Sequence, residues 1–374
     1  MTATSLVLTP TTIKGRLHAA LEPLTTIGKR CALLDYPHYL NLGDHSIWLG
    51  SLFYLTNELD IDVAYAADIA NFSPRSLEQQ AGNAPIVFNG GGNLGDTWPE
   101  FQQFREEIID RYVDRPIFIL PQTVRFRHEE NAIAAAKIFN NHPDLTLFVR
   151  DRISYQIACE YFHNCRVYLA PDMALQLVDV PGLDEIAPPK RDRILYLFRE
   201  DSELDDRFAP SALGVPNLDV EDWVSFGWKM GHPRSMVRRA IAAALRDGWM
   251  RGIAVPQEWK ARRSWLNDRP YTENLKNHTA PQFNSRSWSF LHSGIYQLKR
   301  YNLIITNRLH GHLLCVILGI PHVFLPNSYY KNEQFYQAWT KELPFCRFVT
   351  EPDRVAEAVE ELRSQLGYGK FSDQ

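Results

Sequence analysis

The chain has no apolar run approaching the roughly 20 residues that a bilayer-spanning helix needs. Its first residues, 1–6, show no basic segment followed by an apolar core, so we expect no signal peptide. The five cysteines are an odd number, with no Cys-x-x-Cys pair and no zinc-ligand spacing. We therefore expect a cytoplasmic protein with reduced, mostly buried thiols and no metal site.

The chain also has no excess of positive charge. It has 40 Lys and Arg residues and 44 Asp and Glu residues, for a net charge of −4, so we expect no nucleic-acid partner. No segment repeats at a short period and none is low in complexity. With 374 residues, 45% of them hydrophobic, the chain is long enough for two hydrophobic cores.

Short apolar segments alternate with amphipathic ones through most of the chain, a pattern typical of parallel sheets covered by helices. In the first half we expect strands at 31–34, 62–66, 86–88, 116–120, 145–149 and 166–169, and helices at 44–57, 99–112, 129–140 and 153–161. In the second half we expect strands at 194–198, 302–306 and 322–325, and helices at 236–249, 291–300, 309–318, 331–339 and 352–366. Residues 201–232 and 256–290 show no clear pattern.

A proline-rich stretch divides the two halves. We predict an N-terminal Rossmann-like domain at 1–180, a linker at 181–192 and a C-terminal Rossmann-like domain at 193–374 that ends in a helix. In open parallel sheets, ligands bind beyond the carboxyl ends of the strands. The turns at these ends are therefore the candidate functional segments.

The segment 306–312, Thr-Asn-Arg-Leu-His-Gly-His, is the most informative of these turns. It places Arg308, Leu309 and His310 between an apolar strand and a helix. Helix N-termini attract anions, a guanidinium adds a planar fork of donors, and an imidazole exchanges protons near neutral pH. We therefore predict a site for a small, multiply charged anion, the alternative being a surface turn after a core strand.

A second turn, 89–96, has four glycines within six residues. Backbone N–H groups of such a loop can face an anion or a sugar, which makes Gly91, Gly92 and Asn93 candidate ligand contacts. The pattern is neither the phosphate-binding loop nor the dinucleotide fingerprint. Asp96 could orient a substrate hydroxyl, or it could instead cap the next helix.

Three further turns offer neutral or acidic polar groups. Asn41 and Asp44 lie at the start of the helix predicted at 44–57, and Gln122 and Thr123 follow the strand predicted at 116–120. In the third turn, after the strand predicted at 322–325, Asn327 is followed by Lys331. Each could contact a substrate, and each has a plain alternative as a capped or proline-terminated turn.

Arginines also follow strands. We expect Arg150 and Asp172 to pair with each other in a supporting role, and Arg199 to face the ligand.

Taken in order, these turns resemble those of the polysaccharide pyruvyl transferase family. The resemblance spans about residues 30–340 and rests on the motifs at 41–44, 90–96, 121–123, 150–154, 170–172 and 308–321. It implies a two-domain GT-B-like fold whose domains face each other across a cleft. It also implies transfer of the carboxyethylidene group of phosphoenolpyruvate to a sugar of an exopolysaccharide or cell-surface glycan precursor, without a cofactor.

The resemblance further implies roles for individual residues. Arg308, His310 and Asp96 are expected to be catalytic, and Leu309 and Arg199 to bind the donor together with the glycine-rich turn. The remaining polar turns would contact the acceptor or support the residues that do. The acceptors of the family, a saccharide or lipid-linked oligosaccharide, are often tethered to membranes, and the basic, tryptophan-containing segment 259–269 could contact the inner membrane face. The alternative is that its tryptophans pack on the second domain.

Two other functions fit the same residues. A nucleotide-sugar glycosyltransferase of similar shape would also use a glycine-rich turn and arginines, against a diphosphate. A saccharide-binding homologue without catalytic activity would keep the fold alone.

Overall fold

The computed structural model describes residues 8–199, 201, 203–223, 255–267, 275 and 277–365, and within them it contains two parallel sheets. The first has seven strands in the order β2-β1-β3-β5-β6-β7, with β4 beside β5. All of its pairings are parallel. Its strands are β1 (Arg30–Leu34), β2 (Asp62–Ala67), β3 (Ile86–Phe88), β4 (Gly91–Gly95), β5 (Ile117–Arg125), β6 (Leu145–Val149) and β7 (Arg166–Leu169).

The second sheet has five strands in the order β12-β11-β10-β8-β9, again all parallel. Strands β3, β6, β8 and β10 are buried along their whole length, as parallel strands covered on both faces must be. The strands of this sheet are β8 (Ile194–Leu197), β9 (Leu218–Glu221), β10 (Ile304–Thr306), β11 (His322–Phe324) and β12 (Cys346–Phe348).

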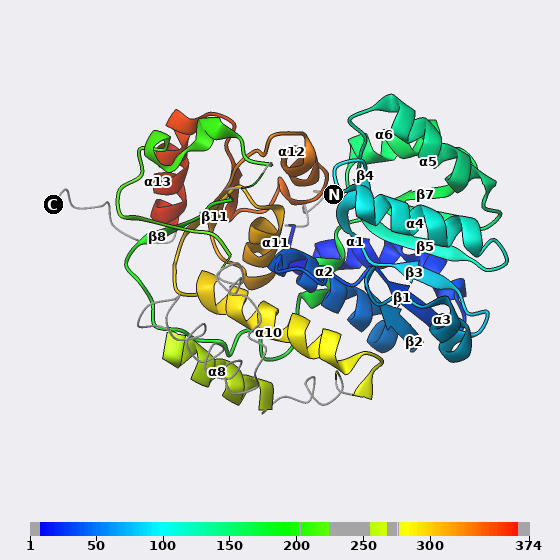
Figure 1. The fold of residues 1–374 in the computed structure, drawn as a ribbon. Coiled ribbons are helices and arrows are strands. Elements are labelled where there is room, and N and C mark those ends of the chain that lie inside the picture. Colours follow the sequence, from blue (N-terminus) through cyan, green and yellow to red (C-terminus); the bar gives the residue numbers. More distant parts are fainter. Residues whose placement is uncertain are drawn as a thin grey trace, which may run out of the picture.

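Helices cover both sheets, and Figure 1 shows the two halves side by side with α2, α10 and α11 in the region where they meet. The helices of the first half are α1 (Pro10–Ala20), α2 (Leu42–Phe53), α3 (Pro74–Ala81), α4 (Pro99–Arg111), α5 (Glu129–Asn141) and α6 (Arg152–Tyr161). Those of the second half are α8 (Val255–Asn267), α10 (Pro281–Leu298), α11 (Leu309–Leu318), α12 (Lys331–Phe335) and α13 (Val355–Gln365).

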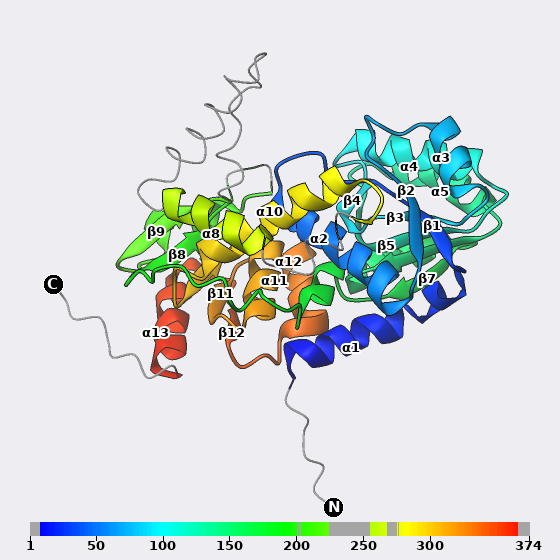
Figure 2. The ribbon, with the colours of Figure 1, turned by 90° about the horizontal axis from the view of Figure 1, so that it is seen from below.

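One hydrophobic core extends from the first half into the second. It includes Trp48 on α2, Met173 in the 3-10 helix Met173–Leu177, Trp288 on α10 and Leu313 on α11. Helix α10 runs along the molecule from one half to the other (Figures 1 and 2) and packs on α2. Tyr36 donates a hydrogen bond to the carbonyl of Phe283 (3.1 Å). The two sheets are thus joined by shared packing.

The glycine-rich turn and the Gln122–Thr123 turn differ from the prediction because both lie within strands. Strand β5 continues past Pro121 to Arg125 and pairs there with β4. The register of β5 against β6 shifts between Ile119 and Gln122, and this irregularity accommodates a proline that has no N–H to donate. Gly95 has φ +124°, and a Cβ there would lie 1.8 Å from the carbonyl oxygen of Arg125. Only glycine permits this strand pairing.

Several elements were not predicted, namely α3, β4, β9, β12 and α8. Helix α10 begins at Pro281, ten residues before the helix that was predicted at 291–300. The predicted linker contributes to the core, since Leu183 and Ile186 are buried. The predicted helix 236–249 lies outside the described residues. Within those residues, no helix combines the length and the apolar character needed to cross a membrane.

Candidate active site

The Arg-Leu-His turn follows β10 and begins α11. The hydroxyl of Thr306 accepts a hydrogen bond from the backbone N–H of Arg308 (3.1 Å), which closes the turn. Gly311 is required here, because a Cβ would lie 2.5 Å from the Thr306 hydroxyl. The Leu309 side chain is buried in the shared core, so it supports the turn from behind.

His310 contacts the first half of the chain at two points. Its ring packs against the backbone of Gly43, where a Cβ would lie 2.2 Å from Nδ1. Its Nε2 lies 3.6 Å from a carboxylate oxygen of Asp172. The ring is nearly buried, with 11% of the side chain exposed. The first polar turn and the Arg-Leu-His turn therefore meet face to face, although 267 positions separate residues 43 and 310.

Asp172 joins His310 to Arg150. The carboxylate accepts a short hydrogen bond from the Arg150 guanidinium and another from the backbone N–H of Ala174 (2.9 Å). Arg150 also donates to the Thr123 hydroxyl (2.9 Å). Complete burial opposes ionisation of Asp172, but Arg150 and His310 outweigh it and lower the pKa to about 2. The predicted pairing of Arg150 with Asp172 is confirmed.

The glycine-rich turn lies beside this ion pair. A Cβ on Gly92 would be 3.0 Å from Nη2 of Arg150 and 4.0 Å from Lys331, which comes from the second half. Gly91 has φ +147°, and a Cβ added there would lie 3.7 Å from the carboxylate of Asp44 and 3.9 Å from the side-chain oxygen of Gln122. The missing side chains thus let cations from both halves approach one segment of backbone.

Lys331 is buried against Glu203, which also pairs with Arg199. Tyr329 donates a hydrogen bond to the other oxygen of Glu203 (3.2 Å). Burial lowers the pKa of Lys331 to about 8, with Arg199 and Arg150 acting in the same direction and Glu203 against them. The Glu203 carboxyl is buried too, but its cationic neighbours hold its pKa well below the usual range.

Arg308 forms a two-pronged ion pair with Asp222, at 2.5 and 2.6 Å. A more distant carboxylate, Asp201, lies 3.9 Å away and also contacts Arg199. Burial and the nearby Arg199 guanidinium lower the pKa of Arg308. Two buried guanidiniums that repel each other can gain from a further anion between them.

The site is therefore a cation chain in two parts, each held together by carboxylates. Asp172 joins Arg150 to His310, whereas Glu203 and Asp201 join Lys331, Arg199 and Arg308, and the two parts approach each other beside Gly92. The site lies where the carboxyl ends of the two sheets face each other, because its members follow β6, β7, β8, β9, β10 and β11. Such an arrangement suits a small ligand with several negative charges and places an imidazole beside it. The members are Arg150, Arg199, Arg308, Lys331 and His310, with Asp172, Asp201, Glu203 and Asp222.

Other predicted residues make different contacts. The Asp96 carboxylate accepts hydrogen bonds from the backbone N–H groups of Arg127 (2.7 Å) and His128 (2.9 Å), just before α5. Asp96 therefore holds the segment before α5 and does not cap the next helix along the chain, since the N-cap residue of α4 is Trp98. Asn93 binds Arg105 and Asp35 through its side chain. No hydrogen bond or ion pair joins Asp96 or Asn93 to the cation chain within the described ranges.

The remaining predicted residues support the turns. Asn41 caps α2 and donates to Asp44 (2.8 Å), Gln122 donates to the carbonyl of Asn89 (3.0 Å), and Asn327 accepts from the backbone of Asn332 (3.2 Å). In the basic segment, Trp265 stacks on Trp288 (4.6 Å) and donates to the carbonyl of Gly182 (2.9 Å), as the packing alternative expected.

Sequence reasoning missed Glu203 and Asp222, and it did not connect Asp172 with His310. Glu203 and Asp222 lie in the stretch without a clear pattern, so nothing in the sequence separated them from surface acids. Asp172 stood in the Ala-Pro-Asp motif after a strand, and that position was the available signal.

Comparisons with known proteins identify the family to which this chain is similar. The family model described as "Polysaccharide pyruvyl transferase" matches residues 41–329. The putative pyruvyl transferase EpsO of Bacillus subtilis is 30% identical over 324 residues, which cover 84% of this chain and 87% of that protein. Pyruvyl transferase 1 of Schizosaccharomyces pombe is 27% identical over 320 residues, 83% of this chain and 70% of that protein.

A solved structure shares the fold. A functionally uncharacterised protein from Klebsiella pneumoniae superposes with a TM-score of 0.52 at 17% identity, covering 92% of this chain and all of the other. That likeness concerns the fold alone. From the extent of the family match and the relatives above, the chain belongs to the polysaccharide pyruvyl transferase family.

Proposed function

We propose that this protein transfers the carboxyethylidene group of phosphoenolpyruvate to two hydroxyls of a sugar in a polysaccharide precursor, releasing phosphate. The observation that carries the proposal is the convergence of four cations and His310 at the facing ends of the two sheets. Phosphoenolpyruvate carries a carboxylate and a phosphate, and both suit the planar fork of arginine.

Binding would divide the two anionic groups between two parts of the cation chain. Arg308 and the N-terminus of α11 would hold one group, and Arg199 with Lys331 would hold the other. Asp222 and Glu203 keep these side chains in place and would share them with the donor. In this arrangement the two sheets act as the halves of a GT-B-like enzyme, with the donor between them.

The chemistry requires four proton transfers, two from the sugar hydroxyls, one to the donor carbon and one to the phosphate. A proton adds to the methylene carbon of the donor, and the first sugar hydroxyl attacks the neighbouring carbon and loses its proton. Phosphate then leaves, and the second hydroxyl attacks the same carbon and loses its proton, which closes the ketal. Two protons leave the sugar; one ends in the new methyl group and one on phosphate. His310 would act as general acid and base, and Asp172 would position its ring.

The direct test offers the purified protein a panel of oligosaccharides with either phosphoenolpyruvate or a nucleotide sugar. Acceptor-dependent phosphate release and a product heavier by one carboxyethylidene group support the proposal. A product heavier by one hexose would identify a glycosyltransferase instead. No product with either donor, across acceptors that a relative converts, would indicate a binding protein.

His310→Ala should lower turnover by roughly 10²–10⁴-fold, the usual contribution of general acid–base catalysis. His163→Ala, at an exposed histidine, is the matched control and should keep wild-type turnover. Circular dichroism of both variants should match the wild type. Near-normal turnover in the His310 variant would remove this residue from the mechanism.

A further inference from the structure

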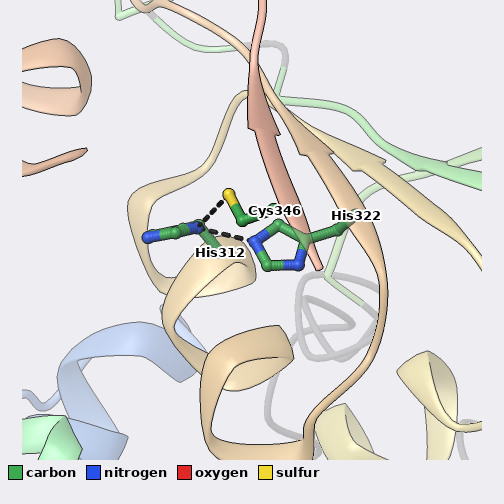
Figure 3. Close-up of side chains that lie close together, drawn as sticks. All are labelled: His312, His322 and Cys346. Carbon is green, nitrogen blue, oxygen red and sulfur yellow. Dashed lines mark hydrogen bonds between the residues drawn. The ribbon is translucent and has the colours of Figure 1, made fainter. Parts of the chain in front are cut away.

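A second group of chemically reactive side chains lies behind the Arg-Leu-His turn. His312 in the first turn of α11, His322 on β11 and Cys346 on β12 converge in the interior, and none is more than 1% exposed. Figure 3 shows the two rings and the sulfur gathered between the helix and the two strands. One ligand atom from each residue lies within 4.8 Å of the other two.

The outer nitrogens of both rings have polar partners. Nδ1 of His322 lies 2.8 Å from the carbonyl oxygen of Ile320, which can only accept, so this nitrogen carries the proton. Nε2 of His322 therefore carries a lone pair, which faces His312 and Cys346. Nε2 of His312 lies 3.0 Å from the Thr340 hydroxyl, which can accept its proton. Partners of this kind fix the tautomer of histidines that bind metals.

The inner nitrogens face each other at 2.7 Å, from Nδ1 of His312 to Nε2 of His322. Two lone pairs cannot approach so closely unless a proton or a cation lies between them. The sulfur of Cys346 lies 3.7 Å from the same nitrogen of His312. Tetrahedral zinc, with bonds of about 2.0–2.1 Å to nitrogen and 2.3 Å to sulfur, places such a nitrogen and sulfur about 3.6 Å apart.

We propose that His312, His322 and Cys346 bind a zinc ion that ties α11 to β11 and β12. On binding, the Cys346 thiol releases its proton to solvent, and the proton on His312 moves to the nitrogen facing Thr340. The two rings must separate by about 0.6 Å to reach the spacing that zinc imposes. Two neutral imidazoles and one thiolate are ligands that zinc accepts.

The buried state of the three groups agrees with this role. Burial lowers the pKa of His322 to about 4, and burial together with the nearby His322 ring lowers the pKa of His312 well below its usual value, which favours the neutral form of both rings. Burial raises the pKa of the Cys346 thiol, with Arg347 opposing, so a nearby cation is needed to form the thiolate. The alternative is that one proton shared by the two histidines satisfies them without metal.

Metal analysis of the full-length protein separates these cases. Protein produced in zinc-supplemented medium and desalted should hold about one zinc per chain. Refolding with Co²⁺ should give the intense near-ultraviolet band of a thiolate–cobalt bond. Cys346→Ser should not show this band, and its affinity for zinc should be at least about tenfold lower. Cys31→Ser, at a buried cysteine of β1, is the matched control and should keep the cobalt band and the wild-type zinc affinity.

Zinc far below one per chain, together with no cobalt band after refolding, would overturn the proposal and leave a hydrogen-bonded histidine pair. A band that persists in Cys346→Ser would overturn it as well. If Cys346→Ser does not fold, His322→Gln provides a second variant with the same expected loss. These readouts do not depend on enzymatic activity, so the proposed function and the zinc site can fail independently.

Discussion

At the scale of single residues, the site depends on the absence of a side chain as much as on charged ones. The His310 ring occupies the space where any other residue at position 43 would place its Cβ. Gly43 lies in the first turn of α2, whereas His310 lies in the first turn of α11. The glycine of the Asn-x-Gly-Asp motif is therefore explained by a contact between the two halves of the chain.

Gly43→Ala should displace His310 and lower turnover by at least about tenfold, because small misplacements of catalytic groups are costly. Gly15→Ala on α1 is the control, since a Cβ there meets nothing within 4 Å. Alanine within a helix should raise the stability of that variant by about 0.5–1 kcal/mol. Turnover and chemical denaturation of both variants provide the comparison, and unchanged turnover in Gly43→Ala would contradict the packing.

Asp172→Asn should cost about 3–5 kcal/mol in the free energy of unfolding at pH 7, because Arg150 would lose its buried partner. The wild-type carboxyl has a lowered pKa of about 2, against a usual value of 3.8. Its stabilisation is therefore complete above about pH 4 and is lost as the pH falls towards 2.

Urea unfolding from pH 7 to pH 2 should show a shallower loss of stability in the asparagine variant below pH 4. Parallel curves for the two proteins would contradict the ion pair. The pH profile of turnover should also move in Asp172→Asn, since the variant changes the charge beside His310.

At the scale of elements, apolar segments buried on both faces could be predicted from the sequence, and glycine-rich ones could not. The strand expected at 145–149 coincides with β6 because all five of its residues are buried. Strand β4 escaped prediction because its residues, Gly-Gly-Asn-Leu-Gly, have low strand propensity. It exists because β5 extends past Pro121 and offers pairing partners.

Gly95→Ala should destabilise the protein by more than the 1–2 kcal/mol that a positive φ alone costs, since its Cβ would also collide with the Arg125 carbonyl. Gly28→Ala isolates the conformational cost, with φ +88° and no neighbour within 4 Å. Thermal unfolding of the two variants should therefore rank Gly95→Ala below Gly28→Ala. Equal melting temperatures would show that β4 can shift to accept the added Cβ without loss of stability.

At the scale of the whole molecule, the order of elements and the convergence of the strand ends were predictable, whereas the choice among acidic residues was not. Asp96 and Asp172 both follow segments at the carboxyl edge of the first sheet. Only the approach of α11 decides that Asp172 reaches His310, and local sequence carries no information about that approach. The core shared by α2 and α10 was not predicted either, because the division of the chain at a proline-rich stretch assumed two separate cores.

Asn284→Ala tests that shared core, because the Asn284 side chain on α10 accepts a hydrogen bond from Trp48 on α2 (3.0 Å). The buried indole N–H would lose its partner, at a cost of about 1–3 kcal/mol. Hydrogen exchange should show equal loss of protection in β1 and in β10, because the core spans both sheets. Loss confined to β10 would mean that the halves unfold separately. Asn140→Ala, on α5 and away from this contact, is the control.

The packing of α10 on α2 has a consequence for recombining family members. A hybrid enzyme joined at residues 181–192 would take these two helices from different parents. In this chain, a Cβ added at Gly294 would lie 2.3 Å from Leu42, so a second parent would have to supply a side chain that fits equally closely at this contact. Functional hybrids should therefore arise when the surfaces of α2 and α10 come from the same parent, wherever the surface loops originate.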